Sequence, residues 1–245
     1  MKPSAISPSE PGPLLAFGAH PDDIEFGCGG VVAGETRSGR AAHFVVCSRG
    51  EAGSNGTPSR RTAEARRAAT VLGATVEFLR LDGDARLELK AGHAVRLAAI
   101  IRRVRPAVIL APTLEENQHP DHWRLGHLVR DAVRLARYGG LAALKGRKPH
   151  TAAALFYYAV SPDSEPPGKA FVLVDISGPA VFSAWKGSME EHASQMRTRN
   201  YVDLQVARAR VLGLGAGIEY AQALFPNDPI VLDSLSVVGR PAGRR

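Results

Sequence analysis

A run of apolar residues that starts at Leu14, LLAFGA, is followed directly by the sequence HPDD, which places His20, Asp22 and Asp23 close together. Adjacent carboxylates that are partly withdrawn from water repel each other, and their pairing costs stability unless a cation or a proton lies among them. Aspartate is also a favoured residue at the start of a helix, where its side chain caps the first turn. This stretch alone therefore fits a helix cap or a metal site, and a metal site needs further ligands elsewhere in the chain.

A second cluster of the same kind follows the apolar run AVILAPT, where the sequence HPDH supplies His119, Asp121 and His122. Two histidines and one carboxylate around a zinc ion leave one coordination position open for water, as in hydrolytic zinc sites. Because both clusters follow an apolar run and precede a helical pattern, they can meet in space. Two such clusters indicate a hydrolytic metal site more strongly than either does alone.

The elements that must position these residues alternate between short β-rich runs and longer helical runs. The predicted strands are LLAFGA, AHFVVCS, TVEFLRL, AVILAPT, ALFYYAV and FVLVDIS. Helices are predicted over residues 24–38, 60–72, 91–104, 122–138, 179–196 and 201–212. This alternation predicts an α/β fold, a single domain with an open, mainly parallel, Rossmann-like sheet and helices on both faces. In such sheets ligands bind at the carboxyl ends of the strands, where both clusters lie.

The stretch FGCGG, at the start of the first predicted helix, consists mostly of small residues. Small residues let the backbone approach another group closely. The spacing does not match the G-x-G-x-x-G fingerprint of dinucleotide-binding proteins, so we do not expect a dinucleotide here. Cys28 lies between the glycines, and we favour packing of a small residue there over zinc binding.

Length and composition fit one globular domain with a large core, since the chain has 245 residues, of which 44% are hydrophobic and 22% are charged. We expect a disordered lead-in over residues 1–13, a folded domain over 14–238 and a basic tail over 239–245. No apolar stretch reaches the roughly 18 residues of a membrane span, and the lead-in lacks the apolar core of a signal peptide. We therefore expect a cytoplasmic protein that does not bind a membrane.

The net charge of +7 raises the question of nucleic acid as a partner. The basic residues are scattered over several segments, and no RNA-binding fingerprint or zinc finger accompanies them. We therefore do not expect nucleic acid as a partner. A basic, zinc-stabilised nucleic-acid-binding or scaffold module remains the alternative from a different class, but it would have no need for Asp22 or His119.

Taken together, the motifs resemble a known enzyme family. The pair AHPDD and HPDH resembles the paired motifs of the LmbE-like (PIG-L) zinc-dependent N-deacetylases, which remove acetyl groups from N-acetylglucosamine conjugates. The resemblance extends over residues 14–235 and includes GSNGTPSRRTAEARRAATVLGA, IIRRVRPAVILAP and the late pair SQ at 194–195. It is strongest for the bacillithiol-pathway branch, which deacetylates N-acetylglucosaminyl malate. The resemblance also implies a homo-oligomer, with a hexamer as the specific expectation.

The resemblance implies a division of roles among the clustered residues. Three of them match zinc ligands: His20, Asp23 and His122. Asp22 matches the general base, which would take a proton from water, and His119 matches a second catalytic residue, whose protonated form would stabilise the oxyanion. Asp121 matches the partner that would hold His119 charged, because a nearby carboxylate raises the pKa of a histidine. Zinc is the expected metal, and Fe(II) can occupy the same type of site.

Residues that follow the second predicted strand are expected to approach the substrate. The loop SRGEAGSNGT (48–57) resembles an active-site loop of the family, although a simple turn-rich loop is the alternative. Three candidate substrate-binding residues lie in or near it: Arg61, Arg49 and Glu51. For Arg61 the alternatives are a solvated position on a helix and a role for the adjacent Arg60 instead. The remaining histidines have no partner at ligand spacing and are expected to be structural or exposed: His43, His93, His127, His150 and His192.

Two departures from the bacillithiol branch bear on the substrate, namely the loop start CSRGEAG and the short segment between Gln195 and Tyr201. We expect an N-acetylglucosaminyl malate deacetylase of bacillithiol synthesis, with a small-molecule aminosugar conjugate as its partner. Alternatives within the family act on a mycothiol precursor, a chitooligosaccharide or a glycopeptide sugar. A metal-dependent esterase or phosphodiesterase is a further alternative, because activated water can attack other electrophiles.

Overall fold

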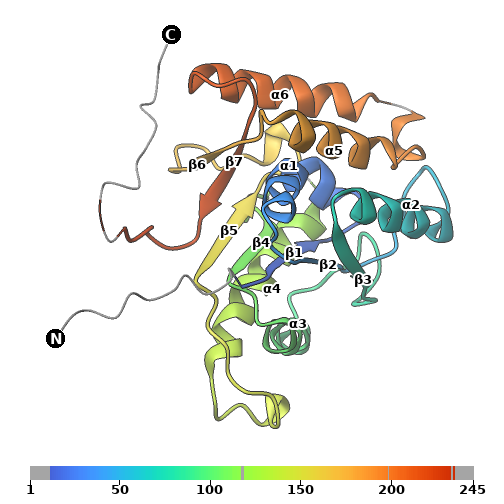
Figure 1. Cartoon of the computed structure of the whole chain (residues 1–245). Helices are drawn as coiled ribbons and strands as arrows, with labels where there is room; N and C mark the ends of the chain where they lie inside the picture. Colours follow the sequence, from blue (N-terminus) through green and yellow to red (C-terminus); the bar gives the residue numbers. More distant parts are fainter. Residues whose placement is uncertain (1–11, 117–118, 198, 233, 235–245) are drawn as a thin grey trace.

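The computed structural model describes residues 12–116, 119–197, 199–232 and 234. Within them the chain forms a seven-stranded sheet in the order β3-β2-β1-β4-β5-β7-β6 (Figure 1). The strands are β1 (Leu14–Gly18), β2 (Ala42–Val46), β3 (Ala74–Phe78), β4 (Val108–Pro112), β5 (Ala154–Tyr158), β6 (Val172–Asp175) and β7 (Ala221–Pro226). Most of the expected lead-in, the expected basic tail and the last residues of the expected domain lie outside the described residues.

Strand β1 lies inside the sheet, where it pairs in parallel with β2 on one side and with β4 on the other. Strands β3 and β5 extend this parallel part outward, whereas β7 runs antiparallel between β5 and β6. The strand order changes direction between β1 and β4, so the carboxyl ends of these two strands flank the crevice in which open α/β sheets bind ligands. The expected α/β fold with a mainly parallel sheet is confirmed.

Helices cover both faces of the sheet: α1 (Asp23–Arg37), α2 (Pro58–Val71), α3 (Ala91–Val104), α4 (Pro120–Arg137), α5 (Pro179–Glu190) and α6 (Tyr201–Gly215). One face is covered by α3 and α4, and the other by α1, α2 and α5, with α6 in contact with α1 and α5 (Figure 1). Alternate residues of β1 serve the two faces, because Leu15 and Phe17 pack with α3 and α4 whereas Leu14 and Ala16 pack with α1. None of the helices described here is both long and apolar enough to cross a membrane.

The small residues at the start of α1 are required by the protein's own aromatic side chains. A Cβ atom on Gly27 would lie 2.1 Å from Cδ2 of Tyr158, and one on Gly29 would lie 2.9 Å from Cδ1 of Trp185. Both rings also donate hydrogen bonds to nearby carbonyl groups, Tyr158 to the end of β1 and Trp185 to the first turns of α1. The close approach in FGCGG is therefore helix packing, which fixes α1 and the residues just before it. Cys28 is buried in the same packing.

Two elements differ from the sequence prediction. The pattern misses β7, because polar Gln222 interrupts a short run; in the structure this side chain is buried and accepts a hydrogen bond from the backbone N–H of Val31 (3.0 Å). The helix expected over 179–196 ends at Glu190. The residues beyond it turn toward α2, where the backbone N–H of Ser194 donates to the Glu64 carboxylate (3.1 Å). In both places a tertiary hydrogen bond outweighs the local pattern.

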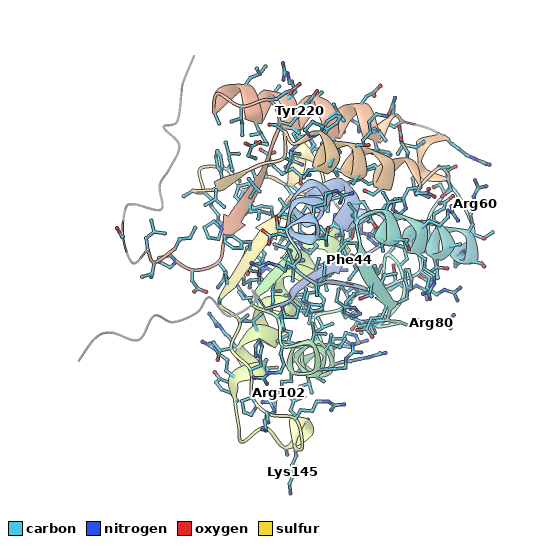
Figure 2. All side chains as sticks on the ribbon, in the orientation of Figure 1. Phe44, Arg60, Arg80, Arg102, Lys145 and Tyr220 are labelled. Atoms are coloured by element: carbon cyan, nitrogen blue, oxygen red, sulfur yellow. The ribbon has the colours of Figure 1, made fainter. Side chains whose placement is uncertain are left out.

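The end of α4 that lies away from the sheet's carboxyl edge is held by one buried arginine, Arg102 (Figure 2). Its guanidinium donates to five carbonyl oxygens, those of Leu135, Ala136, Tyr138, Leu144 and Arg147. Carbonyl groups in the last turn of a helix have no partner within the helix. Arg102 satisfies them from outside and so fixes α4, whose opposite end carries the second histidine cluster.

Candidate active site

The first cluster lies in the connection between β1 and α1, and its backbone is strained at one residue. Asp22 has φ = 126°, a region that glycine adopts readily and other residues adopt at a cost. Although Asp22 occupies the N-cap position of α1, its side chain makes no capping hydrogen bond. Asp23 instead folds its carboxylate back, and Oδ2 accepts from the backbone N–H groups of Ala19 (2.8 Å) and His20 (2.9 Å). The helix-cap interpretation of Asp22 is therefore wrong.

A group of three donor atoms forms where the two clusters meet. His20 Nδ1 lies 3.2 Å from His122 Nε2, which lies 3.1 Å from Asp23 Oδ1. All three side chains are buried, and their donor atoms lie within 4.8 Å of one another. Two imidazole nitrogens and a carboxylate oxygen are a donor set that suits zinc and other divalent first-row metals. The residues present therefore fit a metal ion.

Carboxylates concentrate negative charge around this donor group. Burial would raise the pKa of Asp23, yet His122 and His20 beside it hold that pKa well below its ordinary value. Burial would lower the pKa of His20, but Asp23 and the carboxylates on its other side raise it well above its ordinary value. The raised pKa of His20 indicates that the surrounding carboxylates favour positive charge at this point, which agrees with the donor set.

The other face of His20 meets two more carboxylates. His20 Nε2 lies 3.0 Å from Asp84 Oδ1 and 3.2 Å from Asp121 Oδ2. A carboxylate that binds the second nitrogen of a metal-ligating histidine fixes the orientation of the ring and raises its basicity. Asp84, which the sequence interpretation missed, follows β3 in the sequence LDGDA. Its position after a strand, like that of the two clusters, was the signal that could have found it.

The Asp121 carboxylate lies within 4.8 Å of a ring nitrogen of His119, but its hydrogen bonds go to other groups. The Asp121 carboxylate accepts hydrogen bonds from the backbone N–H groups of Ala85 (2.7 Å) and Leu87 (3.2 Å), besides its contact with His20. Burial would raise the pKa of Asp121, and these partners hold it below its ordinary value. The carboxylate therefore supports His20, and through it the donor group, because the loop after β3 brings its N–H groups to the start of α4.

His119 caps α4 and faces the cavity with its other nitrogen. Its Nδ1 accepts a hydrogen bond from the backbone N–H of Asp121 (3.2 Å), which leaves the proton of the neutral ring on Nε2. Burial, together with the nearby rings of His20 and His122, lowers the pKa of His119. In its neutral form His119 would thus present an Nε2–H donor.

Asp22 points its carboxylate toward Arg61, which comes from α2. Arg61 Nη2 donates to Asp22 Oδ2 (3.4 Å) and to the carbonyl of Pro21 (3.3 Å), and Nη1 lies 3.8 Å from Asp84 Oδ2. Burial raises the pKa of Asp22 to about 6, although Arg61 opposes the shift. Arg61 is itself buried, so the solvated alternative is wrong. The close contacts allow no side chain at Gly50, where a Cβ would lie 2.3 Å from Arg61 Nη1.

A cavity of about 370 Å³ opens onto these groups at the carboxyl edge of the sheet. It is lined by the donor group, Asp22, Arg61, Asp84 and His119 on one side. Phe26, Ala52, Gly53, Ser54, Ala85, Val160, Ser161, Gln195, Tyr201 and Gln205 complete the lining. Arg49 and Glu51 are not among the described residues that line it; the backbone of Arg49 donates to the Glu51 side chain (3.0 Å) instead. The structure thus brings Arg61 to the cavity but not these two candidates.

Two residues from the connection between α5 and α6 also belong to the site region. His192, expected to be structural or exposed, is buried with Nε2 3.6 Å from Glu25 Oε2. Gln195 lines the cavity, although the sequence interpretation noted it only as part of the SQ pair. Neither residue stands at a strand end, so the argument from strand ends could not find them.

Parts of the chain are similar to a known family and to characterised proteins. The family model described as "PIG-L: GlcNAc-PI de-N-acetylase" matches residues 15–133. A 4-oxalmesaconate hydratase of Pseudomonas putida is 33% identical over 138 residues, 51% of this chain and 53% of the relative. A diacetylchitobiose deacetylase of Thermococcus kodakarensis is 30% identical over 163 residues, 61% of each chain. The chain thus spans less than two thirds of the length of these curated relatives.

A solved structure extends the likeness over most of the chain. The conserved protein TT1542 from Thermus thermophilus superposes with a TM-score of 0.80 and is 32% identical, covering 89% of this chain and 96% of that chain. The matched family model covers both β1 and β4, from whose ends the donor group is built. The chain therefore belongs to the PIG-L family.

Proposed function

We propose that the protein is a metal-dependent hydrolase that removes the acetyl group from an N-acetylglucosamine conjugate. The observation that carries the proposal is the pair Asp22 and Asp23: one carboxylate belongs to the donor group, and its neighbour faces the cavity without capping the helix. Hydrolysis of an amide at a metal site uses a metal-activated water and a base beside it. The adjacent aspartates can supply these two functions from one short loop. The PIG-L family model and the deacetylase relative support the same reaction.

Zinc is the metal that we propose, and His20, Asp23 and His122 would hold it. When bound, zinc lowers the pKa of a water molecule toward neutrality and polarises a carbonyl group. Asp84 and Asp121 keep His20 oriented through its Nε2. Fe(II) suits the same donor set, so the loaded metal is part of the proposal and not of the family assignment.

Asp22 and His119 would carry the proton transfers. Asp22, with a pKa raised to about 6, is ionised near neutral pH and can still hold the proton it takes from water. It can then pass this proton to the amine that leaves. His119 holds a proton on Nε2, which can donate to the carbonyl oxygen as negative charge develops there. Arg61 would keep the Asp22 carboxylate oriented.

For the substrate, we propose N-acetylglucosaminyl malate as in bacillithiol synthesis. The cavity has a cationic side chain, Arg61, on its wall, and this group would be the recognition point for the malate carboxylates. Arg61 also contacts two carboxylates of the site, which limits its capacity for another anion. Chitooligosaccharides are therefore the main rival within the family, supported by the Thermococcus relative. A mycothiol precursor and a glycopeptide sugar remain in the test panel.

A second candidate reaction is the hydration of an unsaturated tricarboxylate. The Pseudomonas putida relative, a 4-oxalmesaconate hydratase, is 33% identical over 138 residues. Hydration also uses a positioned water and a general base, so the same residues could serve it. The two reactions differ in the product: deacetylation releases acetate and a primary amine, whereas hydration releases neither.

The proposal is tested with the purified protein loaded with zinc. Amine and acetate release are measured on N-acetylglucosaminyl malate, diacetylchitobiose, a mycothiol precursor and an N-acetylated glycopeptide. Loss of ultraviolet absorbance of 4-oxalmesaconate is measured in parallel. Deacetylation of any sugar substrate supports the reaction, and the ranking identifies the conjugate. Hydration without deacetylation across the panel would replace the proposed function by the second candidate.

A further inference from the structure

The connection between α5 and α6 contributes one polar side chain to the cavity whose orientation is fixed by the protein. Gln195 begins the short 3-10 helix η3 (Gln195–Arg197), after the end of α5. In Figure 1 this connection lies beside the loop that leads into α2. The side chain is partly buried and lines the same cavity as Asp22 and His119, on a different wall.

The amide group of Gln195 has its two ends assigned by its neighbours. Nε2 donates to the backbone carbonyl of Asn55 (2.9 Å) and to the Ser194 hydroxyl (2.9 Å). A backbone carbonyl can only accept, so the atom that faces Asn55 must be the NH₂ group. The Ser194 hydroxyl donates its own proton to Glu64 Oε2 (2.5 Å), so it too can only accept from Gln195. The amide cannot flip without losing both bonds.

The carboxylate of Glu64 fixes Ser194 through hydrogen bonds. This carboxylate is buried and accepts from Ser194 twice and from Arg60 Nε (3.0 Å). Burial would raise the pKa of Glu64, and these hydrogen bonds hold it below its ordinary value. The charged carboxylate thus determines the direction of the Ser194 hydroxyl, which in turn determines the direction of the Gln195 amide.

The remaining atom, Gln195 Oε1, is an acceptor for which no donor is found among the residues that the structure describes. Gln205, the other glutamine of the lining, differs: its Nε2 donates to Val160 (2.8 Å) and its Oε1 accepts from Arg208 (3.4 Å). A fixed acceptor in a cavity favours a ligand with a donor at that point and disfavours an analogue that lacks it.

We infer that Gln195 is a specificity-determining residue that accepts a hydrogen bond from a ring hydroxyl of the sugar substrate through Oε1. The inference rests on the proposed function, since it takes the substrate to be a sugar. Sugars present several hydroxyl donors, and an apolar wall formed by Phe26 and Tyr201 lies along the same cavity. Gln195 touches no reacting group, so its contribution is to substrate recognition.

The test combines one enzyme variant with altered substrates. Gln195→Met keeps the length of the side chain but removes both the donor and the acceptor. We expect kcat/KM for the parent N-acetylglucosamine conjugate to fall roughly threefold to tenfold, as for one neutral hydrogen bond, mainly through KM. Monodeoxy analogues, each lacking one ring hydroxyl, are then assayed with both enzymes. For one analogue, the one that lacks the recognised hydroxyl, the variant and the wild-type enzyme should have equal kcat/KM, because neither enzyme can form the hydrogen bond with it.

Gln205→Met is the matched control, because its amide is already bonded to the protein at both ends. It is expected to lower the melting temperature and to leave the ratio of parent to deoxy activity at the wild-type value. A Gln195→Met loss that is the same for the parent and for every monodeoxy analogue would overturn the inference, and so would no loss at all. If the variant fails to fold, Ser194→Ala, which removes the link to Glu64, should weaken the same hydroxyl selectivity.

Failure of the proposed function gives a different result from failure of this inference. If wild-type enzyme deacetylates none of the sugars, the proposed function fails, and the inference is judged by binding alone. N-acetylglucosamine and its monodeoxy analogues are then titrated calorimetrically into wild-type and Gln195→Met protein. Equal affinities of the two proteins for every sugar, or no binding by the wild type, would overturn the role of Gln195.

Discussion

The two HPD tripeptides of the chain, at His20–Asp22 and His119–Asp121, have the same sequence and follow neighbouring parallel strands, yet their aspartates have opposite environments. Asp22 has positive φ and makes no capping hydrogen bond, and burial raises its pKa to about 6. Asp121 accepts two backbone N–H groups and contacts His20, and its pKa is lowered against the effect of burial. Identical residues thus give a carboxylate with a raised pKa in one tripeptide and a carboxylate with a lowered pKa in the other.

The two histidines differ in the same way. His20 is buried, with one nitrogen in the donor group and the other against two carboxylates. His119 is about one third exposed, and its Nδ1 is used by the helix cap. The difference arises outside the tripeptides, because the loop after β3 brings the Asp84 carboxylate to His20 and the backbone N–H group of Ala85 to Asp121. A repeated motif therefore does not imply repeated roles.

The largest effect is expected from the ligand next to Asp22. Asp23→Asn keeps an oxygen for the backbone N–H groups of Ala19 and His20 but removes the charge that faces the metal. We expect loss of stoichiometric zinc and of activity together, a larger effect than the roughly 10–100-fold typical of residues behind the ligands. Elemental analysis after desalting measures the metal, and circular dichroism checks the fold. Full zinc content in this variant would remove Asp23 from the ligand set.

The same substitution one residue earlier should act on turnover alone. Asp22→Asn preserves the size of the side chain, so it still fits beside Arg61. The contact with Arg61 is weaker because the negative charge is lost. We expect zinc to be retained and kcat to fall by about 10²–10⁴, the usual contribution of a general base. Asp131→Asn, on the exposed side of α4, is the control with no expected change. An Asp22→Asn enzyme with near wild-type kcat, or one that loses its zinc, would contradict the assigned role.

In the second tripeptide the isosteric change should have an intermediate effect. Ala85 and Leu87 donate to different oxygens of Asp121, so Asp121→Asn keeps an acceptor for only one of them and presents a neutral group to His20. We expect a loss of roughly 10–100-fold in metal affinity or activity, as for other residues that orient a ligand. Zinc affinity is measured by competition with a chromophoric chelator. Unchanged affinity together with unchanged kcat would mean that Asp84 alone supports His20.

The sequence predicts what depends on local pattern and misses what depends on tertiary contact. The placement of His20 after β1 and of His119 after β4 follows from apolar runs, and the convergence of the two clusters follows from the geometry of parallel sheets. Asp84 carries no motif, and it enters the site because the loop after β3 folds against α4. The partner of Asp121 could not be chosen from spacing, because His20 lies about one hundred residues away in the chain. The orientation of Gln195 depends on a hydrogen bond to Asn55, which lies 140 residues away in the chain.

The smallest expected effect is on stability. The difference in the free energy of unfolding between a Gly and an Ala variant should have opposite signs at positions 22 and 121. At position 22 the backbone has φ = 126°, so a Cβ atom costs free energy that glycine avoids. At position 121 the backbone is helical, where glycine is roughly 1 kcal/mol less favourable than alanine.

Within each pair of variants the lost carboxylate is the same, so the difference in stability between Gly and Ala isolates the contribution of the backbone. We therefore expect Asp22→Gly to be more stable than Asp22→Ala by about 1 kcal/mol, and Asp121→Gly to be less stable than Asp121→Ala. The four free energies of unfolding, measured by urea titration of the zinc-free proteins so that metal binding does not contribute, decide the matter. An Asp22→Ala protein as stable as Asp22→Gly would mean that the loop relaxes to an ordinary φ, and that the strain at the reactive aspartate is not a property of the fold.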